Sequence, residues 1–271
     1  MNAKYTLLVN TSDGFEDCWN PFFKLYYQYW NAKDVPILLN TEWKTGYSYF
    51  NLPISCTQSN ASNPERRLTW SECLKNALTM VETELVLYVQ EDYFIEQAVD
   101  NELIMDMVEL MLKDPKIKYI GLTHFGNCPP FGAWKQDKRL VEVQQTKYRI
   151  STQAGIWRKE TLNSYLKPEE NGWMFEIFGT QRAKRRKELF LTLNRAFYNA
   201  SCPAILYTHT GIIKGKWHRL MPALFNKHRI DMDFNIRGIY KEKSYLFRKL
   251  ETGMKLLKQP IQFYKGMRGK D

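Results

Sequence analysis

A short apolar run ends abruptly in two adjacent acidic residues about a third of the way along this chain. The run, from Leu85 to Gln90, is brief and rich in aliphatic residues, which predicts an interior strand of a parallel sheet. Open α/β sheets bind their ligands just beyond the carboxyl ends of the strands, where Glu91 and Asp92 would stand. Two carboxylates in that position indicate a divalent cation held against a phosphate, or else a polar strand end that opens a turn.

Strand and helix patterns alternate along the first half of the sequence. Short apolar segments predict four strands, at Tyr5–Val9, Val35–Leu39, Leu85–Gln90 and Ile117–Leu122. Apolar residues at helical spacing predict helices between them, at Trp19–Trp30, Trp70–Val81 and Leu103–Met111. This alternation predicts an α/β fold in which helices flank a mostly parallel central sheet.

The second half carries weaker patterns. We expect a strand at Lys147–Gln153, a helix at Trp173–Leu189 and another short strand at Ala204–Tyr207. The sequence has no internal repeat and no linker rich in glycine or serine. The simplest partition is therefore one large domain over residues 1–235 and a helical, basic C-terminal appendage over residues 236–271.

Composition narrows the class of protein further. Apolar residues make up 44% of the 271 residues, which excludes a disordered chain. No apolar run approaches the roughly 20 residues of a membrane-spanning helix, and the N-terminus has no signal-peptide pattern. The five cysteines are scattered without CxxC spacing, which argues against a structural zinc site or a disulfide framework. We therefore expect a cytoplasmic protein.

The net charge of +10 is concentrated at the C-terminal end. Residues 236–271 hold ten Lys or Arg and three acidic residues, so they account for seven of the ten net charges. Between Leu246 and Leu257, apolar residues recur at helical spacing beside the basic ones. Such a segment can lie in the headgroup region of an anionic membrane, which would make the protein peripheral at the inner face. The alternative is that the apolar stripe packs on the large domain.

Three polar clusters contain the candidate functional residues. The first follows the first strand and contains Thr11, Ser12 and Asp13, which can hold a base or ribose in a nucleotide-binding sheet, or form a plain turn. The second is Glu176, which aromatic residues flank. Removal from water would raise its pKa, as a general base near neutral pH requires. An ion pair with Arg182 is the alternative.

The third cluster follows the last predicted strand. His209, at the end of that strand, is a candidate metal ligand. Lys214 and Lys216 lie next to glycines and could neutralise a diphosphate, or else lie in a solvated loop. The segment does not match the Walker phosphate-loop pattern.

The order of these clusters resembles that of GT-A-type glycosyltransferases, in particular bacterial enzymes of capsule, O-antigen and lipooligosaccharide biosynthesis. The resemblance spans roughly Tyr5 to Trp217. In that family a DxD motif binds Mn²⁺ or Mg²⁺ together with the diphosphate of a nucleotide sugar. The matching place here reads Gln90-Glu91-Asp92, without the first aspartate, so the metal requirement stays open.

The resemblance implies a GT-A, Rossmann-like nucleotide-sugar-binding fold and a role for each candidate residue. Asp92 and His209 would bind the divalent cation. Glu176, the match to the family's catalytic acid motif, would take the proton of the acceptor hydroxyl in an inverting transfer. The nucleotide sugar would be bound by residues of three loops: Thr11, Ser12, Asp13, Glu91, Asp92, Lys214 and Lys216.

The expected function is transfer of a hexose-like sugar from a nucleotide-sugar donor to a saccharide or lipid-linked acceptor in surface polysaccharide biosynthesis. A sugar-nucleotide nucleotidyltransferase is an alternative, although its usual glycine-rich loop with a basic residue near the first strand is missing. A non-enzymatic nucleic-acid-binding protein would suit the net positive charge and the sixteen tyrosines. That function would leave Glu91, Asp92 and Glu176 without a role, and the sequence contains no recognisable nucleic-acid-binding module. We therefore expect no nucleic acid partner.

Overall fold

The computed structural model describes residues 3–62 and 65–242, and the chain divides into two compact units, Met1–His209 and Thr210–Asp271. The predicted boundary after residue 235 falls inside the second unit. Most of the predicted basic appendage, residues 243–271, lies outside the described residues. The division between residues 235 and 236 therefore stays a prediction.

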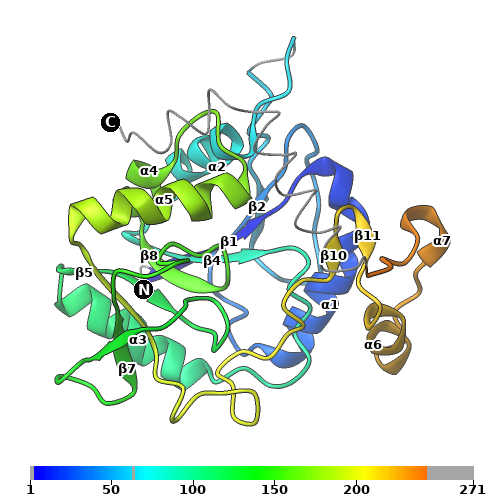
Figure 1. Cartoon of the computed structure of the whole chain (residues 1–271). Coiled ribbons are helices and arrows are strands. Elements are labelled where there is room, and N and C mark those ends of the chain that lie inside the picture. The colour runs from blue at the N-terminus through cyan, green and yellow to red at the C-terminus, as the bar shows by residue number, and fades with distance from the viewer. Residues whose placement is uncertain (1–2, 63–64, 243–271) are drawn as a thin grey trace. The chain divides into compact units, whose positions relative to one another are not determined.

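In the described part of the first unit, nine strands form one sheet in the order β3-β2-β1-β4-β8-β5-β9-β7-β6 (Figure 1). Four strands from the first third of the chain are parallel neighbours: β1 (Tyr5–Asn10), β2 (Ile37–Asn40), β3 (Ile54–Cys56) and β4 (Leu85–Gln90). The others are β5 (Ile117–Gly121), β6 (Phe131–Ala133), β7 (Leu140–Val143), β8 (Gly155–Arg158) and β9 (Leu189–Leu193). All of β1 and nearly all of β4 are buried, which is why both read as uninterrupted apolar runs.

The α/β class is confirmed, with a sheet that is mixed. β8 runs antiparallel to both of its neighbours, β4 and β5, and β7 runs antiparallel to β9. Gly155 at the start of β8 permits this insertion, because a Cβ at that position would come within 2.5 Å of the Tyr119 ring. The reversed strand therefore depends on a glycine where an aromatic ring crosses it.

The strand predicted at Lys147–Gln153 is wrong. This segment is irregular, and the strand is β8, which begins at Gly155. Side chains, rather than a sheet ladder, hold the segment in place. The buried guanidinium of Arg149 donates to the backbone carbonyl oxygens of Val143 and Glu188. A residue pattern that resembles a strand thus belongs to a loop fixed by its own polar side chains.

The strand predicted at Ala204–Tyr207 is also wrong. Its backbone makes only an isolated antiparallel bridge from Tyr207 to Ile95, in the loop that follows β4. The backbone N–H of Glu96 donates to the carbonyl oxygen of Leu206 at 2.9 Å. The segment is apolar because it is buried against that loop, and it does not join the main sheet.

Helices cover both faces of the sheet (Figure 1). One face packs against α2 (Trp70–Thr79), α4 (Lys159–Tyr165) and α5 (Gly172–Arg186). The other carries α1 (Trp19–Tyr29), which follows the 3₁₀ helix η1 (Asp13–Cys18), and α3 (Asn101–Lys113). The indole N–H of Trp30, at the end of α1, donates to the Asn101 side chain at 3.1 Å. The helices predicted from apolar spacing are confirmed, with shifts of a few residues at their ends.

Arg182, on α5, forms a buried ion pair with Glu170. Its guanidinium donates to both carboxylate oxygens of Glu170 at 2.6 Å, and both side chains are 4% exposed. The same guanidinium donates to the backbone carbonyl oxygen of Tyr165 at the end of α4. Arg182 is therefore the partner of Glu170, and not of Glu176 as the alternative interpretation of the sequence had it.

The described part of the second unit packs around Trp217, which is fully buried. Trp217 lies on a two-stranded hairpin, β10 (Ile212–Ile213) and β11 (Lys216–Trp217). Its ring contacts Phe225 on α6 (Met221–Lys227) and Phe234 on α7 (Phe234–Arg237). In the described residues of either unit, no helix combines the length and the apolar composition that crossing a bilayer requires.

Candidate active site

Polar side chains gather at the edge of the sheet where its parallel strands end. Asn10, the last residue of β1, lies in register with Asn40 at the end of β2 and with Gln90 at the end of β4. The Asn40 amide donates to the Asn10 side-chain oxygen at 2.8 Å, and the Thr57 hydroxyl donates to Asn40 at 3.0 Å. Because the three strands end together, the polar loops that follow them meet at one place.

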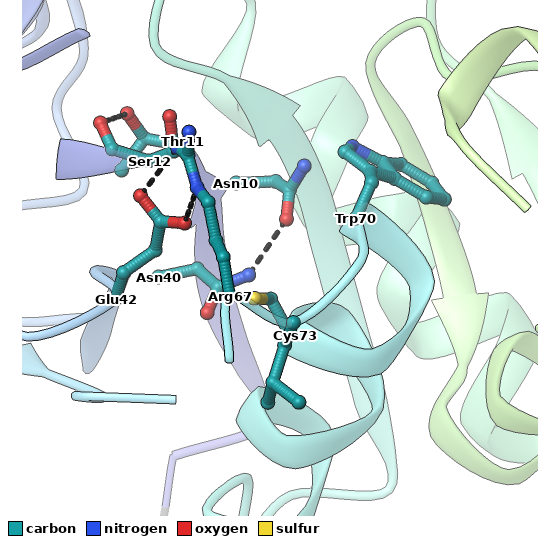
Figure 2. A pocket seen from close by; sticks show the side chains of 9 residues that line it. Asn10, Thr11, Ser12, Asn40, Glu42, Arg67, Trp70 and Cys73 are labelled. Atoms are coloured by element: carbon teal, nitrogen blue, oxygen red, sulfur yellow. Dashed lines mark hydrogen bonds and ion pairs between the residues drawn. The ribbon is translucent and has the colours of Figure 1, made fainter. Parts of the chain in front are cut away.

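A cavity of about 220 Å³ lies at this edge, beside the ends of β1 and β2 (Figure 2). Its lining comes from the loops after these strands and from the start of α2: Asn10, Thr11, Ser12, Asn40, Glu42, Arg67, Leu68, Trp70 and Cys73. In Figure 2, Trp70 lies on one side and the ion pair of Glu42 with Arg67 on the other. The cavity is smaller than the roughly 300–1,000 Å³ typical of whole-ligand pockets, so it suits one part of a larger ligand.

Glu42 forms one wall of this cavity, and Asp13 holds it in place. The Asp13 carboxylate accepts hydrogen bonds from the backbone N–H groups of Glu42, Trp43 and Lys44 at 2.9–3.0 Å. In return, the Asp13 N–H donates to the Glu42 carboxylate, which also binds the Arg67 guanidinium. Asp13 thus acts on the cavity through Glu42, and its direct contact with a nucleotide stays a prediction. The predicted residues Thr11 and Ser12 line the cavity themselves.

Glu91 and Asp92 follow β4 directly and are 8% and 5% exposed. Their neighbour Tyr88 is buried in β4, and burial raises the pKa of its phenol well above the ordinary value. The Glu91 carboxylate raises this pKa further, as does that of Glu176, while the Asn10 side chain lowers it. Tyr88 thus lies within electrostatic reach of Glu91 and Glu176, and Asn10, which also affects its pKa, lines the cavity.

Glu176 lies near the start of α5 and is mostly buried. Its Oε1 accepts hydrogen bonds from the backbone N–H of Thr152 at 2.8 Å and from the Thr152 hydroxyl at 2.9 Å. Burial raises the pKa of Glu176 above its ordinary value, and the hydrogen bonds from Thr152 and Ser151 offset this only in part. A raised pKa for Glu176 is the shift expected from the sequence. A carboxylate with a raised pKa is a better proton acceptor than an ordinary one.

The residue next to Glu176 connects α5 to the cavity. The Phe175 ring packs against Trp70, with ring centroids 5.5 Å apart, and Trp70 lines the cavity. Gly172, the first residue of α5, lies against the same indole, which a Cβ at this position would contact at 3.4 Å. The first turn of α5, which also carries Glu176, therefore packs against a wall of the cavity through Trp70.

His209 and Asp92, the two predicted metal ligands, are connected through aromatic side chains. The exposed ring of His209 packs edge-on against Phe125 at 5.2 Å, and Phe125 packs against Tyr207. Burial raises the pKa of Tyr207, and Asp92 is close enough to raise it further. Within the described residues, no three His, Cys, Asp or Glu side chains come together as a metal-binding group. Their joint role as ligands stays a prediction.

Lys214 and Lys216 belong to the second unit, in the β10–β11 hairpin. Ile213 pairs with Lys216, so Lys214 and Gly215 form the two-residue turn. Both have positive φ, +52° and +76°, as a type I′ turn requires. Gly215 therefore serves the turn, and both lysine side chains are exposed. Their contact with a diphosphate stays a prediction.

The structure adds site residues that the sequence analysis missed. Asn40 ends β2 and Glu42 follows it, much as Glu91 and Asp92 follow β4, so the same strand-end argument could have found them. Arg67 and Trp70 reach the cavity from the segment before α2 and from its start, and no local pattern marks them. Thr152 was missed because its segment was predicted to be a strand.

Comparison with known proteins finds only distant similarities. No family model and no curated protein matches the chain. Among solved structures, TarS 1–349 from S. aureus in complex with UDP is 16% identical with a TM-score of 0.44, covering 70% of this chain and 57% of that one. This chain therefore spans little more than half of that structure. UDP-glucose pyrophosphorylase complexed with UDP-glucose is 8% identical with a TM-score of 0.41, and the match covers 71% of this chain and 90% of that one.

Glucosyl-3-phosphoglycerate synthase from Mycobacterium tuberculosis, in complex with phosphoglyceric acid, is 11% identical with a TM-score of 0.43, covering 84% of this chain and 81% of that one. At such low identity, similar folds can carry unrelated functions, so the chemistry must be argued from the residues of the site. GT-A-type glycosyltransferases are nevertheless among the solved structures to which this chain is similar, and they are the family that its sequence resembles.

Proposed function

We propose that this chain is an inverting glycosyltransferase that moves a sugar from a nucleotide-sugar donor to a saccharide or lipid-linked acceptor. The observation that carries the proposal is a small cavity at the ends of β1 and β2, on the sheet edge where the buried carboxylates Glu91 and Asp92 follow β4, together with Glu176, a carboxyl group whose pKa is raised. The cavity would hold the base and ribose, and the diphosphate would extend towards Asp92. A role in surface polysaccharide biosynthesis is part of the proposal and rests on the resemblance of the sequence.

In the proposed reaction, Glu176 takes the proton of an acceptor hydroxyl as its oxygen forms a bond to the anomeric carbon of the donor sugar. The bond from that carbon to the diphosphate breaks, and the nucleoside diphosphate leaves with the electron pair. A single displacement inverts the configuration of the anomeric carbon. The raised pKa of Glu176 favours proton uptake, and Thr152 keeps the carboxylate in place.

The same carboxyl group argues against a nucleotidyltransferase. In a nucleotidyltransferase that acts on a sugar phosphate, the attacking oxygens are already ionised at neutral pH and need no base. A sugar hydroxyl, in contrast, does need a proton acceptor. The raised pKa of Glu176 therefore favours reaction of a hydroxyl over reaction of a sugar phosphate.

A divalent cation, Mn²⁺ or Mg²⁺, is proposed at Asp92 with help from His209. Mg²⁺ sites for phosphates commonly use only one or two carboxylates and complete their shell with phosphate oxygens and water. The buried Asp92 carboxylate fits such a partial shell, although the described residues contain no preformed group of three ligands. When bound, the cation would offset negative charge on the leaving diphosphate.

Filling the cavity should weaken nucleotide binding. Ser12 lines the cavity in an extended backbone conformation, and its side chain does not cap the following helix, so a large side chain can replace it without loss of structure. We expect Ser12→Trp to raise the dissociation constant for the preferred nucleoside diphosphate by on the order of tenfold or more. Thermal shift against a panel of nucleoside diphosphates, with and without Mn²⁺, would measure this.

A tryptophan at the far end of α2 is the matched control. Met80 caps the C-terminus of this helix and is 46% exposed, so Met80→Trp adds the same ring away from the cavity. It should leave the thermal shift unchanged. If no nucleoside diphosphate stabilises the unmodified protein, or if both tryptophans act alike, the cavity does not bind the donor.

The basic C-terminal segment is proposed to attach the enzyme to membranes that carry a lipid-linked acceptor. Most of this segment, residues 243–271, lies outside the described residues, and the proposal rests on the ten basic residues of 236–271. Each Lys or Arg near an anionic surface contributes about 1 kcal/mol, so we expect the full chain to float with anionic vesicles at low salt and not with neutral ones. Removal of residues 241–271 should abolish flotation. Equal flotation of the shortened chain would contradict this attachment.

A further inference from the structure

Thr152 makes two hydrogen bonds to one oxygen of the proposed catalytic base. Its backbone N–H and its hydroxyl both donate to Oε1 of Glu176, at 2.8 and 2.9 Å, and its side chain is 8% exposed. Hydrogen bonds to the charged form of a carboxyl group favour that form. They also fix the orientation of the carboxylate, because both donors come from a single residue.

The segment that carries Thr152 is itself fixed by the loop after β4. The Tyr93 hydroxyl, one residue beyond Asp92, donates to the carbonyl oxygen of Thr152 at 2.9 Å. Tyr207 stacks on Tyr93 with ring centroids 4.5 Å apart, and its hydroxyl accepts a hydrogen bond from the Ala154 N–H at 3.0 Å. The donors to Glu176 are thus tied to the loop that presents the strand-end carboxylates.

We propose that Thr152 is the positioning residue for Glu176, holding the base in the orientation and charge state in which it accepts the proton of the incoming hydroxyl. The proposal rests on the proposed function, because it takes Glu176 as the base. Through Tyr93, Thr152 also sets the position of the base relative to the Asp92 loop, so the base and the proposed diphosphate site are aligned by one set of contacts.

Few charged groups compete with the effect of the Thr152 hydrogen bonds on the pKa of Glu176. Among the residues that the structure describes, four phenols face Glu176: Tyr88, Tyr93, Tyr119 and Tyr148, from β4, the loop after it, β5 and the loop before Thr152. Burial raises the pKa of each phenol, so all four stay protonated and neutral near pH 7. The hydrogen bonds from Thr152 are therefore the interactions to alter.

The test replaces Thr152 in the full-length protein and follows Glu176 by carboxyl ¹³C NMR, with the Glu176→Gln spectrum to assign its signal. Thr152→Val keeps the volume and the N–H donor but removes the hydroxyl. We expect the midpoint of the Glu176 titration to move up by about one pH unit. The acidic limb of the pH–rate profile of kcat should move by the same amount, and Thr152→Ser should restore both. Thr152→Cys, with a weaker donor, should lie between.

Thr180→Val is the matched control. Thr180 lies on α5, and its hydroxyl accepts a hydrogen bond from the N–H of Ile150, in the segment that carries Thr152. Thr180→Val should weaken the packing of the segment that carries Ile150 and Thr152, and it should leave the titration midpoint of Glu176 unchanged. An unshifted Glu176 signal in Thr152→Val, or an equal shift in Thr180→Val, overturns the proposal. If the titration shifts as expected but no sugar is transferred, the proposed function fails while the control of Glu176 by Thr152 stands.

Discussion

Replacing Glu176 by glutamine is expected to lower kcat by about 10²–10⁴-fold, the usual contribution of a general base. Glutamine keeps the shape of the side chain and can still accept hydrogen bonds from Thr152, but it cannot take a proton. The change should not lower thermal stability, since burial disfavours the charge that it removes. Initial rates and melting temperatures, measured on the same preparations, separate the two effects.

Glu160→Gln provides the control for this loss. Glu160 lies on α4 with its side chain 82% exposed, so the same chemical change there should leave the rate unaltered. The anomeric configuration of the product, read by NMR, is an independent check. Retention of configuration, or a normal rate in Glu176→Gln, would show that Glu176 is not the base of a single displacement.

Replacing Asp92 by asparagine is expected to reduce kcat by about 10²–10³-fold, as is typical when a group that stabilises developing charge is removed. Asp92 stands at the end of β4, and its side chain is almost fully buried. Asparagine has nearly the same shape but no charge to hold a cation against the diphosphate. We also expect Mn²⁺ to lose its effect on the affinity for the nucleoside diphosphate, which titrations with and without the metal would measure.

Asp106→Asn is the matched control for this second prediction. Asp106, on α3, makes an exposed ion pair with Arg139, and such surface pairs contribute little. The control should keep full activity and the same response to Mn²⁺. Near-normal turnover in Asp92→Asn, with circular dichroism showing an intact fold, would remove Asp92 from the proposed site.

The position of the site could be predicted from the sequence because it depends on local patterns. A strand buried on both faces must be apolar along its length, so β4 can be recognised in the sequence from Leu85 onwards. The carboxylates after it mark the edge of the sheet where ligands bind. The raised pKa of Glu176 was predicted in the right direction from its aromatic neighbours in sequence, although the phenols that face it come from distant segments.

The contacts that complete the site come from residues far apart in the chain, and only the tertiary structure decided them. Thr152 lies 24 residues from Glu176, and Glu42 lies 25 residues from Arg67. The segment of Thr152 has a strand-like pattern, yet the buried Arg149 bonds to backbone carbonyl groups on both sides of it and keeps it out of the sheet. Such bonds leave no periodic signal, because their partners, at the end of β7 and just before β9, are brought together by the pairing of those two strands.

The sequence by itself determined the α/β class, the strand that ends in Glu91 and Asp92, and the concentration of positive charge at the C-terminal end. These features follow from the hydrophobicity and charge of the residues themselves, which do not depend on the tertiary contacts. The tertiary structure decided that Arg182 serves Glu170 and leaves Glu176 to Thr152. The physical reason is that a buried charge must find a partner in space, and the nearest partner in space need not be near in sequence.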